Sequence, residues 1–146
     1  MSSSRELLLL DTNVVLHVVR GNEIGHRVDA LFHIRHRADR PLISVVSIGE
    51  CLALARQWNW GSEKRATLEQ LLRELVVVDI QAREILERYA ELHSWSRQHG
   101  RTLGDNDLWI AATAAAVNAH LITTDADFDS LHPQHVRRTY IETSVN

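Results

Sequence analysis

The sequence predicts an α/β fold in which a mostly parallel central sheet is flanked by helices. Short continuous apolar runs, such as Leu7 to Leu10, are typical of strands that are buried on both faces. They alternate along the chain with longer segments whose apolar residues recur at a helical period, as between Leu68 and Leu75. This alternation indicates parallel strands, because a helix is the usual connection that carries the chain back to begin a parallel neighbour.

Length and composition predict one globular domain, residues 1–146, with residues 1–4 as a loose polar tail. The 146 residues suit one hydrophobic core, and 45% hydrophobic and 24% charged residues are an ordinary balance. No apolar run approaches the roughly 20 residues that a membrane helix needs, and Leu7 to Leu10 is too short for a signal peptide. We therefore expect a cytoplasmic protein without membrane contact. The single cysteine, Cys51, has no disulfide partner in the chain, which agrees with a reducing compartment.

The net charge of −3 bears on the kind of ligand that the chain can hold. Proteins that bind nucleic acid mainly by electrostatic attraction are usually strongly basic, and this chain is not. An RNA-binding protein of this composition would need a localised site in which cations offset its own carboxylates.

The first predicted strand, Leu7 to Leu10, is followed by Asp11 to Asn13, which can cap a helix. Val14 to Val19 is therefore predicted to be a short helix that stops at Gly21, although its β-branched residues would also suit a strand. The next predicted elements are, in order, a helix over Ile24–Ala38, a strand over Leu42–Val46 introduced by Pro41, a helix over Ser47–Trp58 and a helix capped by Ser62.

The second half of the chain continues the alternation. Three consecutive valines, Val76 to Val78, predict another short buried strand, and Gly100 is expected to cap the long helix that follows it. The predicted elements are, in order, the strand Val76–Val78, a helix over Ala82–His99, an alanine-rich helix over Asp105–Asn118, a strand over Leu121–Thr124 and an edge strand over Val136–Ile141.

Four acidic residues stand at corresponding ends of the predicted elements. Asp11 and Asp125 directly follow strands, whereas Glu50 and Asp107 lie in the first turns of helices. Ligands of open parallel sheets bind beyond the carboxyl ends of the strands, so we expect these four side chains to converge in one crevice. Carboxylate oxygens are the ligands that Mg²⁺ and Mn²⁺ prefer, and such a cation activates water for phosphodiester hydrolysis.

Taken singly, each acid also has a structural explanation. The structural alternatives are an N-cap for Asp11, a capping box for Ser47 to Glu50, a favourable helix-end charge for Asp107 and its neighbour Asp105, and turn formation for Asp125, Asp127 and Asp129. For each residue alone the structural explanation is the stronger one. The shared placement of the four acids favours a site.

Four segments resemble the acidic motifs of PIN-domain nucleases. They are Leu9–Asn13, Ser47–Glu50, Asn106–Ala114 and Leu121–Phe128, and the resemblance extends from about Glu6 to Ile141. It implies a PIN-like three-layer sandwich and a Mg²⁺-dependent ribonuclease, with Mn²⁺ as a substitute cofactor. It also implies a set of catalytic and metal-binding residues, namely Asp11, Glu50, Asp107 and Asp125.

Three acids compete for the last of these positions, namely Asp125, Asp127 and Asp129. We assign Asp125, because it directly follows the predicted strand, and we keep Asp127 as an additional candidate metal ligand. Three further polar residues are expected to position ligands or water around the acids, namely Thr12, Asn13 and Thr123.

Among PIN domains, the length of the chain and its Asp107 motif most resemble the VapC-type ribonuclease toxins of toxin–antitoxin systems. This resemblance implies an endoribonuclease that cleaves RNA, forms a homodimer and is silenced by a cognate antitoxin protein. The apolar stripe from Leu68 to Leu75 and the long helix from Ala82 offer hydrophobic faces for that dimer.

Other functions stay open on the residues alone. An aspartyl phosphatase would need a second Asp two residues after Asp11, where Asn13 stands, and the chain has no Gly-x-x-x-x-Gly-Lys phosphate loop. Two alternatives keep the fold: a non-toxin PIN nuclease of RNA maturation or decay, and a non-catalytic interaction module. Loss of the acids would have indicated the module, and all four acids are present.

Overall fold

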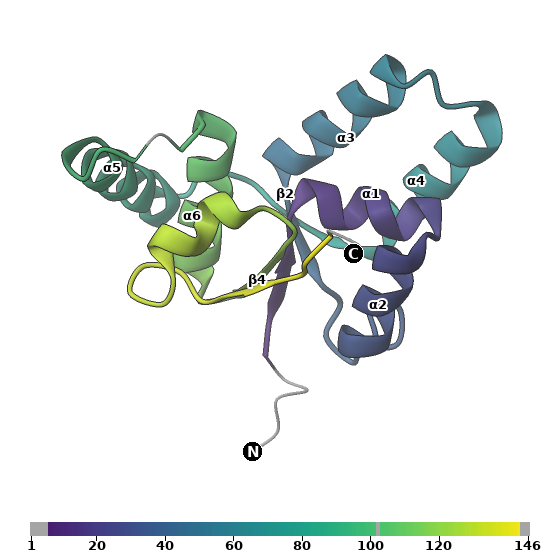
Figure 1. The fold of residues 1–146 in the computed structure, drawn as a ribbon, viewed down its shortest axis with the longest axis horizontal. Coiled ribbons are helices and arrows are strands. Elements are labelled where there is room, and N and C mark those ends of the chain that lie inside the picture. The colour runs from purple at the N-terminus through teal and green to yellow at the C-terminus, as the bar shows by residue number, and fades with distance from the viewer. Residues whose placement is uncertain (1–5, 102, 144–146) are drawn as a thin grey trace.

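The computed structural model describes residues 6–101 and 103–143. The tail expected at residues 1–4 lies outside these ranges. The elements are, in chain order, β1 (Leu8–Leu10), α1 (Thr12–Arg20), α2 (Glu23–Phe32), β2 (Leu42–Ser44), α3 (Val45–Gln57), α4 (Ser62–Glu74), β3 (Val76–Val78), α5 (Arg83–Gln98), α6 (Asp105–Val117), β4 (His120–Thr123), the 3₁₀ helix η2 (Ala126–Leu131) and β5 (Arg138–Tyr140) (Figure 1). Within the described ranges, no helix is long and apolar enough to cross a lipid bilayer.

The strands form one five-stranded sheet in the order β3-β2-β1-β4-β5. All of its strand pairings are parallel, as the alternation of elements predicts. The central strand is β1, in which Leu9 lies opposite Leu42 of β2 and Leu121 of β4. The chain builds the sheet outward from β1 to β3 and then returns to add β4 and β5 on the other side. The gap between β1 and β4 is therefore the topological switch point, where ligands bind in open α/β sheets.

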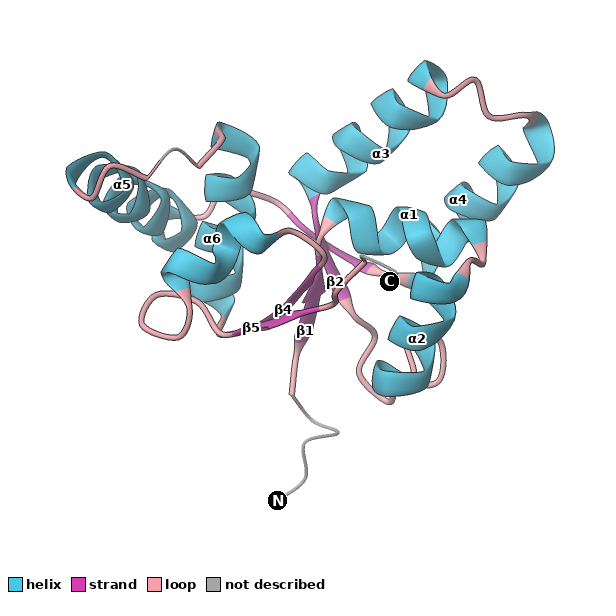
Figure 2. Cartoon of the chain, viewed as in Figure 1, coloured by secondary structure: helices cyan, strands magenta, loops and turns pink. Residues whose placement is uncertain are grey.

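Alternate residues of the central strand enter two separate hydrophobic cores. Leu8 and Leu10 belong to the core that contains apolar residues of α1, α2, α3 and α4. Leu9 points to the opposite face and belongs to the core of α5 and α6. The helices accordingly cover both faces of the sheet, with α1 to α4 on one side and α5 and α6 on the other (Figure 2). The fold is the three-layer α/β sandwich that the sequence predicts.

The β-branched run after β1 is a helix, as predicted. Asp11 is the N-cap of α1, and Gly21 ends the helix in the left-handed region with a φ of 63°. Between these two signals Val14, Val15 and Val19 are buried in the first core. Capping at both ends and burial of one face therefore outweigh the preference of valine for strands.

The start of α3 differs from the prediction. Strand β2 ends at Ser44, which is the N-cap of α3, and its Oγ accepts a hydrogen bond from the backbone N–H of Val46 at 3.1 Å. The structural alternative for Glu50, a capping box over Ser47 to Glu50, is excluded, because Ser47 is fully buried inside the helix. Glu50 consequently lies in the second turn of α3 and not in the first.

Two other helix ends also differ from the prediction. Helix α2 ends at Phe32 and does not reach Ala38, because His33 adopts a left-handed φ of 52° and stops it. Helix α4 does begin at Ser62, but its N-cap is Gly61, which offers no side-chain hydrogen bond. The predicted cap at Ser62 is therefore wrong.

Strand β3 is more exposed, and the preceding leucine stripe is more buried, than the sequence predicts. Val76 is 38% exposed and Val77 is 50% exposed, because β3 is an edge strand with β2 as its neighbour. The stripe from Leu68 to Leu75 is buried in the core with α1 to α3. The proposal that this stripe supplies a dimer face is therefore wrong, since its apolar surface is already covered within the chain.

Candidate functional site

Asp11 lies at the switch point between β1 and β4. Its Oδ1 accepts a hydrogen bond from the backbone N–H of Thr12 at 2.8 Å, and its Oδ2 accepts one from Thr123 Oγ at 2.7 Å. The residue is only 4% exposed. The pKa of Asp11 is raised to about 6, because burial, helped by the nearby charges of Asp125 and Glu50, outweighs the two hydrogen bonds that lower it. Asp11 is thus both the N-cap of α1 and a buried acid at the crevice.

Glu50 faces the same crevice from α3. Thr12 Oγ donates a hydrogen bond to its Oε1 at 2.6 Å, and Asn106 Nδ2 donates one to its Oε2 at 2.9 Å. Both carboxylate oxygens are therefore held by neighbouring elements, α1 and α6, and each keeps a lone pair for another ligand. Sequence reasoning did not single out Asn106, and its only signal is an amide between two acids in the first turn of α6.

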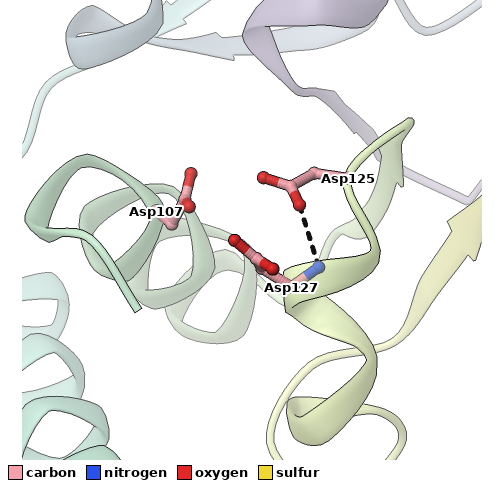
Figure 3. A group of neighbouring side chains, drawn as sticks. All are labelled: Asp107, Asp125 and Asp127. Carbon is pink, nitrogen blue, oxygen red and sulfur yellow. Dashed lines mark hydrogen bonds between the residues drawn. The ribbon is translucent and has the colours of Figure 1, made fainter. Parts of the chain in front are cut away.

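Three carboxylates converge beside these two acids (Figure 3). One oxygen each from Asp107, Asp125 and Asp127 lies within 4.8 Å of the others. Asp107 comes from the first turn of α6, whereas Asp125 and Asp127 follow β4. The backbone N–H of Asp127 donates to Asp125 Oδ1 at 2.9 Å, and Thr123 Oγ accepts from the backbone N–H of Asp125 at 2.9 Å. The sequence-predicted acids Asp107 and Asp125 therefore meet, and Asp127 joins them.

The charges of all five acids interact at Asp107. Burial, and after it the charges of Asp11, Asp125, Glu50 and Asp127 in that order, together raise the pKa of Asp107 to about 7. Carboxylates so close together repel one another unless a proton or a cation neutralises them. The donor set consists of hard oxygen atoms, which fits a Mg²⁺ or Mn²⁺ ion.

The other residues singled out in the sequence have different environments. Thr12 and Thr123 contact the acids directly, as described above. Asn13 is exposed, and its side chain makes no hydrogen bond within the described ranges. Asp129 is turned to another partner, because its Oδ1 accepts from Arg138 Nη2 at 2.8 Å. Of the three acids that compete for the fourth position, Asp125 and Asp127 thus lie in the cluster.

Cys51 follows Glu50 but is fully buried in the first core. Burial raises the pKa of its thiol to about 12, and the charges of Glu50 and Asp11 act in the same direction. The thiol is therefore protonated at neutral pH, which excludes a thiolate nucleophile at this site.

Solved structures of other proteins share this fold. The structure of VapBC2 from Rickettsia felis bound to a promoter DNA fragment aligns with a TM-score of 0.76 and 21% identity, and the alignment covers 92% of this chain and 98% of the other. The structure of VapBC-1 from nontypeable Haemophilus influenzae aligns with a TM-score of 0.74 and 22% identity, covering 92% of this chain and 97% of the other.

Sequence comparison finds relatives of similar length. Ribonuclease VapC1 of Haemophilus influenzae is 32% identical over 121 residues, which are 80% of this chain and 85% of that protein. Ribonuclease VapC5 of Mycobacterium tuberculosis is 31% identical over 135 residues, which are 90% of this chain and 92% of that protein. Residues 8–132 match the PIN domain, and the chain therefore belongs to the PIN domain family.

Proposed function

We propose that this chain is a metal-dependent endoribonuclease that hydrolyses RNA phosphodiester bonds, and that it is the toxin of a toxin–antitoxin pair. The observation that carries the proposal is the convergence of Asp107, Asp125 and Asp127 within 4.8 Å at the switch point of the sheet. Its relatives of similar length are named Ribonuclease VapC, which supports RNA as the substrate.

Asp11, Glu50, Asp107 and Asp125 are the proposed catalytic and metal-holding residues, with Asp127 as an additional ligand. A Mg²⁺ ion held there, or Mn²⁺ in its place, would lower the pKa of a bound water and offset the charge that develops on the phosphate. The chain itself holds these oxygens in position. Thr123 restrains Asp11, while Thr12 and Asn106 fix the two oxygens of Glu50.

RNA cleavage is the direct test. The purified chain should cut a short single-stranded RNA in the presence of Mg²⁺ or Mn²⁺ and stop when EDTA is added. The products should include fragments cut at internal positions of the RNA, which distinguishes an endonuclease from an exonuclease. Cleavage that continues in EDTA would show that no metal is involved, and absence of cleavage with either metal would leave the non-catalytic module as the better explanation.

The proposed partners are RNA, a cognate antitoxin and a second copy of the chain, in the cytoplasm. Solved relatives include a structure described as a toxin–antitoxin complex from Klebsiella pneumoniae, which supports the antitoxin. Induced expression should arrest growth, and co-expression of a small protein encoded beside the gene should restore it. RNA cleavage in vitro without growth arrest would favour the non-toxin PIN nuclease.

The homodimer is tested by light scattering. A single chain has a mass of 16.6 kDa, and the proposal expects about twice that mass at micromolar concentration. The dimer face is expected outside the buried leucine stripe. A mass that stays at that of one chain in concentrated solution would contradict the homodimer and leave the nuclease proposal intact.

A further inference from the structure

Two adjoining cavities lie beside the acidic cluster, along the connection between α5 and α6. The first has a volume of about 410 Å³ and is lined by Asp127 of the cluster, by Asp129 and Ser130, and by Arg101 and Leu103 of the connection. The second has a volume of about 210 Å³ and is lined by the same Arg101 and Leu103, by His93 and Arg97 of α5 and by Asp105 of α6. Arg101 and Leu103 line both cavities, so they adjoin the carboxylate of Asp127 on one side and the basic residues of α5 on the other.

The local fold holds Arg101 in this position. Gly100 has a φ of 65°, a left-handed conformation that turns the chain back at the end of α5. Ser96, which is 3% exposed, then donates its Oγ hydrogen bond to the carbonyl oxygen of Arg101, and its own carbonyl accepts from the Arg101 N–H at 2.8 Å. The backbone of Arg101 is therefore fixed to the last turn of α5 on both sides.

No carboxylate lies within ion-pair distance of Arg97 or Arg101 in the part of the chain that the structure describes, although Asp105 and Asp129 line the same cavities. Neither guanidinium makes an ion pair or a side-chain hydrogen bond there, whereas Arg137 and Arg138 are paired with Glu6 and Asp129. An arginine without a partner beside a cavity keeps all its donors for a ligand, and a guanidinium matches the geometry of a phosphate.

We propose that Arg101, assisted by Arg97, binds a backbone phosphate of the RNA next to the one that is cut. The inference rests on the proposed ribonuclease function and adds a positioning residue to it. A chain with a net charge of −3 cannot attract RNA through its overall charge, so a local cationic path is needed. The strand then runs from the acidic cluster over Arg101 into the second cavity. Arg101 touches a neighbouring phosphate and takes no part in bond breaking.

The test compares Arg101→Gln with Arg101→Lys and with a matched control, Arg83→Gln. Arg83 lies at the opposite end of α5, about 20 Å away along the helix, and its side chain is 85% exposed in an ion pair with Glu87. The two glutamine variants remove the same charge. For Arg101→Gln we expect KM on a short RNA to rise about tenfold while kcat changes less than about twofold.

Salt provides a second readout that a structural defect would not change. Loss of one phosphate contact should reduce the slope of log(kcat/KM) against log[KCl] by about 0.7 in Arg101→Gln. Arg101→Lys should recover most of this slope, and Arg83→Gln should match wild type. A salt slope for Arg101→Gln equal to that of Arg83→Gln would overturn the inference and leave the proposed nuclease function intact. A slope for Arg101→Lys as low as that for Arg101→Gln would show that the charge at this position is not what matters and would overturn it as well.

Binding separates this inference from the proposed function. A fluorescent single-stranded oligouridylate is titrated into Asp107→Asn protein, with and without Arg101→Gln, and anisotropy is measured. Binding that depends on Arg101 supports the subsite even if the wild type proves unable to cut RNA. RNA binding that is the same with and without Arg101→Gln, or no RNA binding at all, overturns the proposed subsite. Arg101-dependent binding of an acidic peptide in place of RNA would assign the path to a protein partner and would also overturn it.

Discussion

Asp107 carries a carboxylate where a negative charge is unfavourable, because burial and four other acids raise its pKa to about 7. A helix-end acid of the ordinary kind behaves differently, since its charge stabilises the positive N-terminal end of its helix. The sequence alone allowed both explanations for Asp107. The raised pKa separates them, because it predicts opposite effects on stability when the charge is removed.

Asp107→Asn is therefore expected to leave the metal-free protein as stable as wild type or more stable, by about 0.5–2 kcal/mol. The same variant should lose RNA cleavage by at least about a hundredfold, because the cluster loses a negatively charged carboxylate that would hold the metal. Urea unfolding in EDTA measures the stability. Glu63→Gln is the matched control, since Glu63 is an acid in the first turn of α4, and it should cost about 0.3–1 kcal/mol without affecting cleavage. An Asp107→Asn protein that is destabilised and still active would contradict this assignment.

Asp125 and Asp127 are expected to contribute unequally to metal binding. Both offer an oxygen to the group within 4.8 Å, but Asp125 is half-buried whereas Asp127 is exposed and competes with water. Asp125→Asn should weaken Mn²⁺ binding roughly tenfold or more, and Asp127→Asn should weaken it less. Calorimetric titration of Mn²⁺ into the wild type and both variants measures the difference. Unchanged affinity in both variants would remove this side of the cluster from the metal site.

At the scale of single residues, sequence reasoning found the acids but not all of their partners. The placement of Asp11 and Asp125 follows from the strand order, because Asp11 directly follows β1 and Asp125 stands two residues after the neighbouring parallel strand β4. Asn106 was missed, because its hydrogen bond to Glu50 joins residues 56 positions apart and depends on how α3 and α6 pack. Pattern along the chain cannot reveal such a contact.

At the scale of elements, the hydrophobic pattern predicted every strand, and the errors are in the bounds of helices and strands and in the exposure of β3. The error at α3 arose because Ser44 and Ser47 are both good caps in the sequence, and only the point where β2 stops decides between them. The stop of α2 at His33 depends on a left-handed residue that is not glycine, which gives little local signal. Burial of β3 was overestimated because its edge position is a property of the whole sheet.

The close packing of α1 and α2 gives a prediction at this scale. A Cβ added at Gly25 of α2 would lie 2.3 Å from the carbonyl oxygen of His17 in α1, so the two helices would have to separate. Gly25→Ala should cost about 1–3 kcal/mol of unfolding free energy. Gly49→Ala is the matched control, because a Cβ there meets nothing within 4 Å, and it should stabilise α3 by about 0.5–1 kcal/mol. Urea unfolding measures both, and equal effects of the two substitutions would contradict the close approach.

At the scale of the whole molecule, the strand order determines where the charges gather. The switch point between β1 and β4 brings Asp11 and Asp125 to the same edge, and α3 and α6 add Glu50 and Asp107 to it. The remaining charge is spread over exposed surfaces, where ion pairs such as Arg27–Glu23 contribute little to stability. The acidic cluster is thus the place at which the fold is sensitive to pH and to cations.

The metal-free protein is therefore expected to lose stability as pH rises from about 4 to about 7. An acid with a raised pKa keeps its proton in the folded state over a pH range in which the unfolded chain has lost it. In the fold the pKa is about 6 for Asp11 and about 7 for Asp107, against 3.8 for an unperturbed Asp. The folded state then binds more protons in this window, so the free energy of unfolding falls with rising pH.

Two histidines change the free energy of unfolding in the opposite direction as pH rises, so the wild type alone does not isolate the effect of the acids. Burial lowers the pKa of His17 and of His120, so their contribution to stability grows as pH rises. The informative quantity is therefore the difference in unfolding free energy between the wild type and Asp107→Asn, measured by urea unfolding in EDTA across this pH range.

The unfolding free energy of the variant should exceed that of the wild type by near zero at about pH 4 and by about 1 kcal/mol above pH 7. This value discounts the pKa shift for solvent at the half-buried Asp107. Saturating Mn²⁺ should reverse the order, because the wild type then gains stability from bound metal as its carboxylates ionise. A difference that is independent of pH and of Mn²⁺ would show that the five acids do not act as one charged cluster.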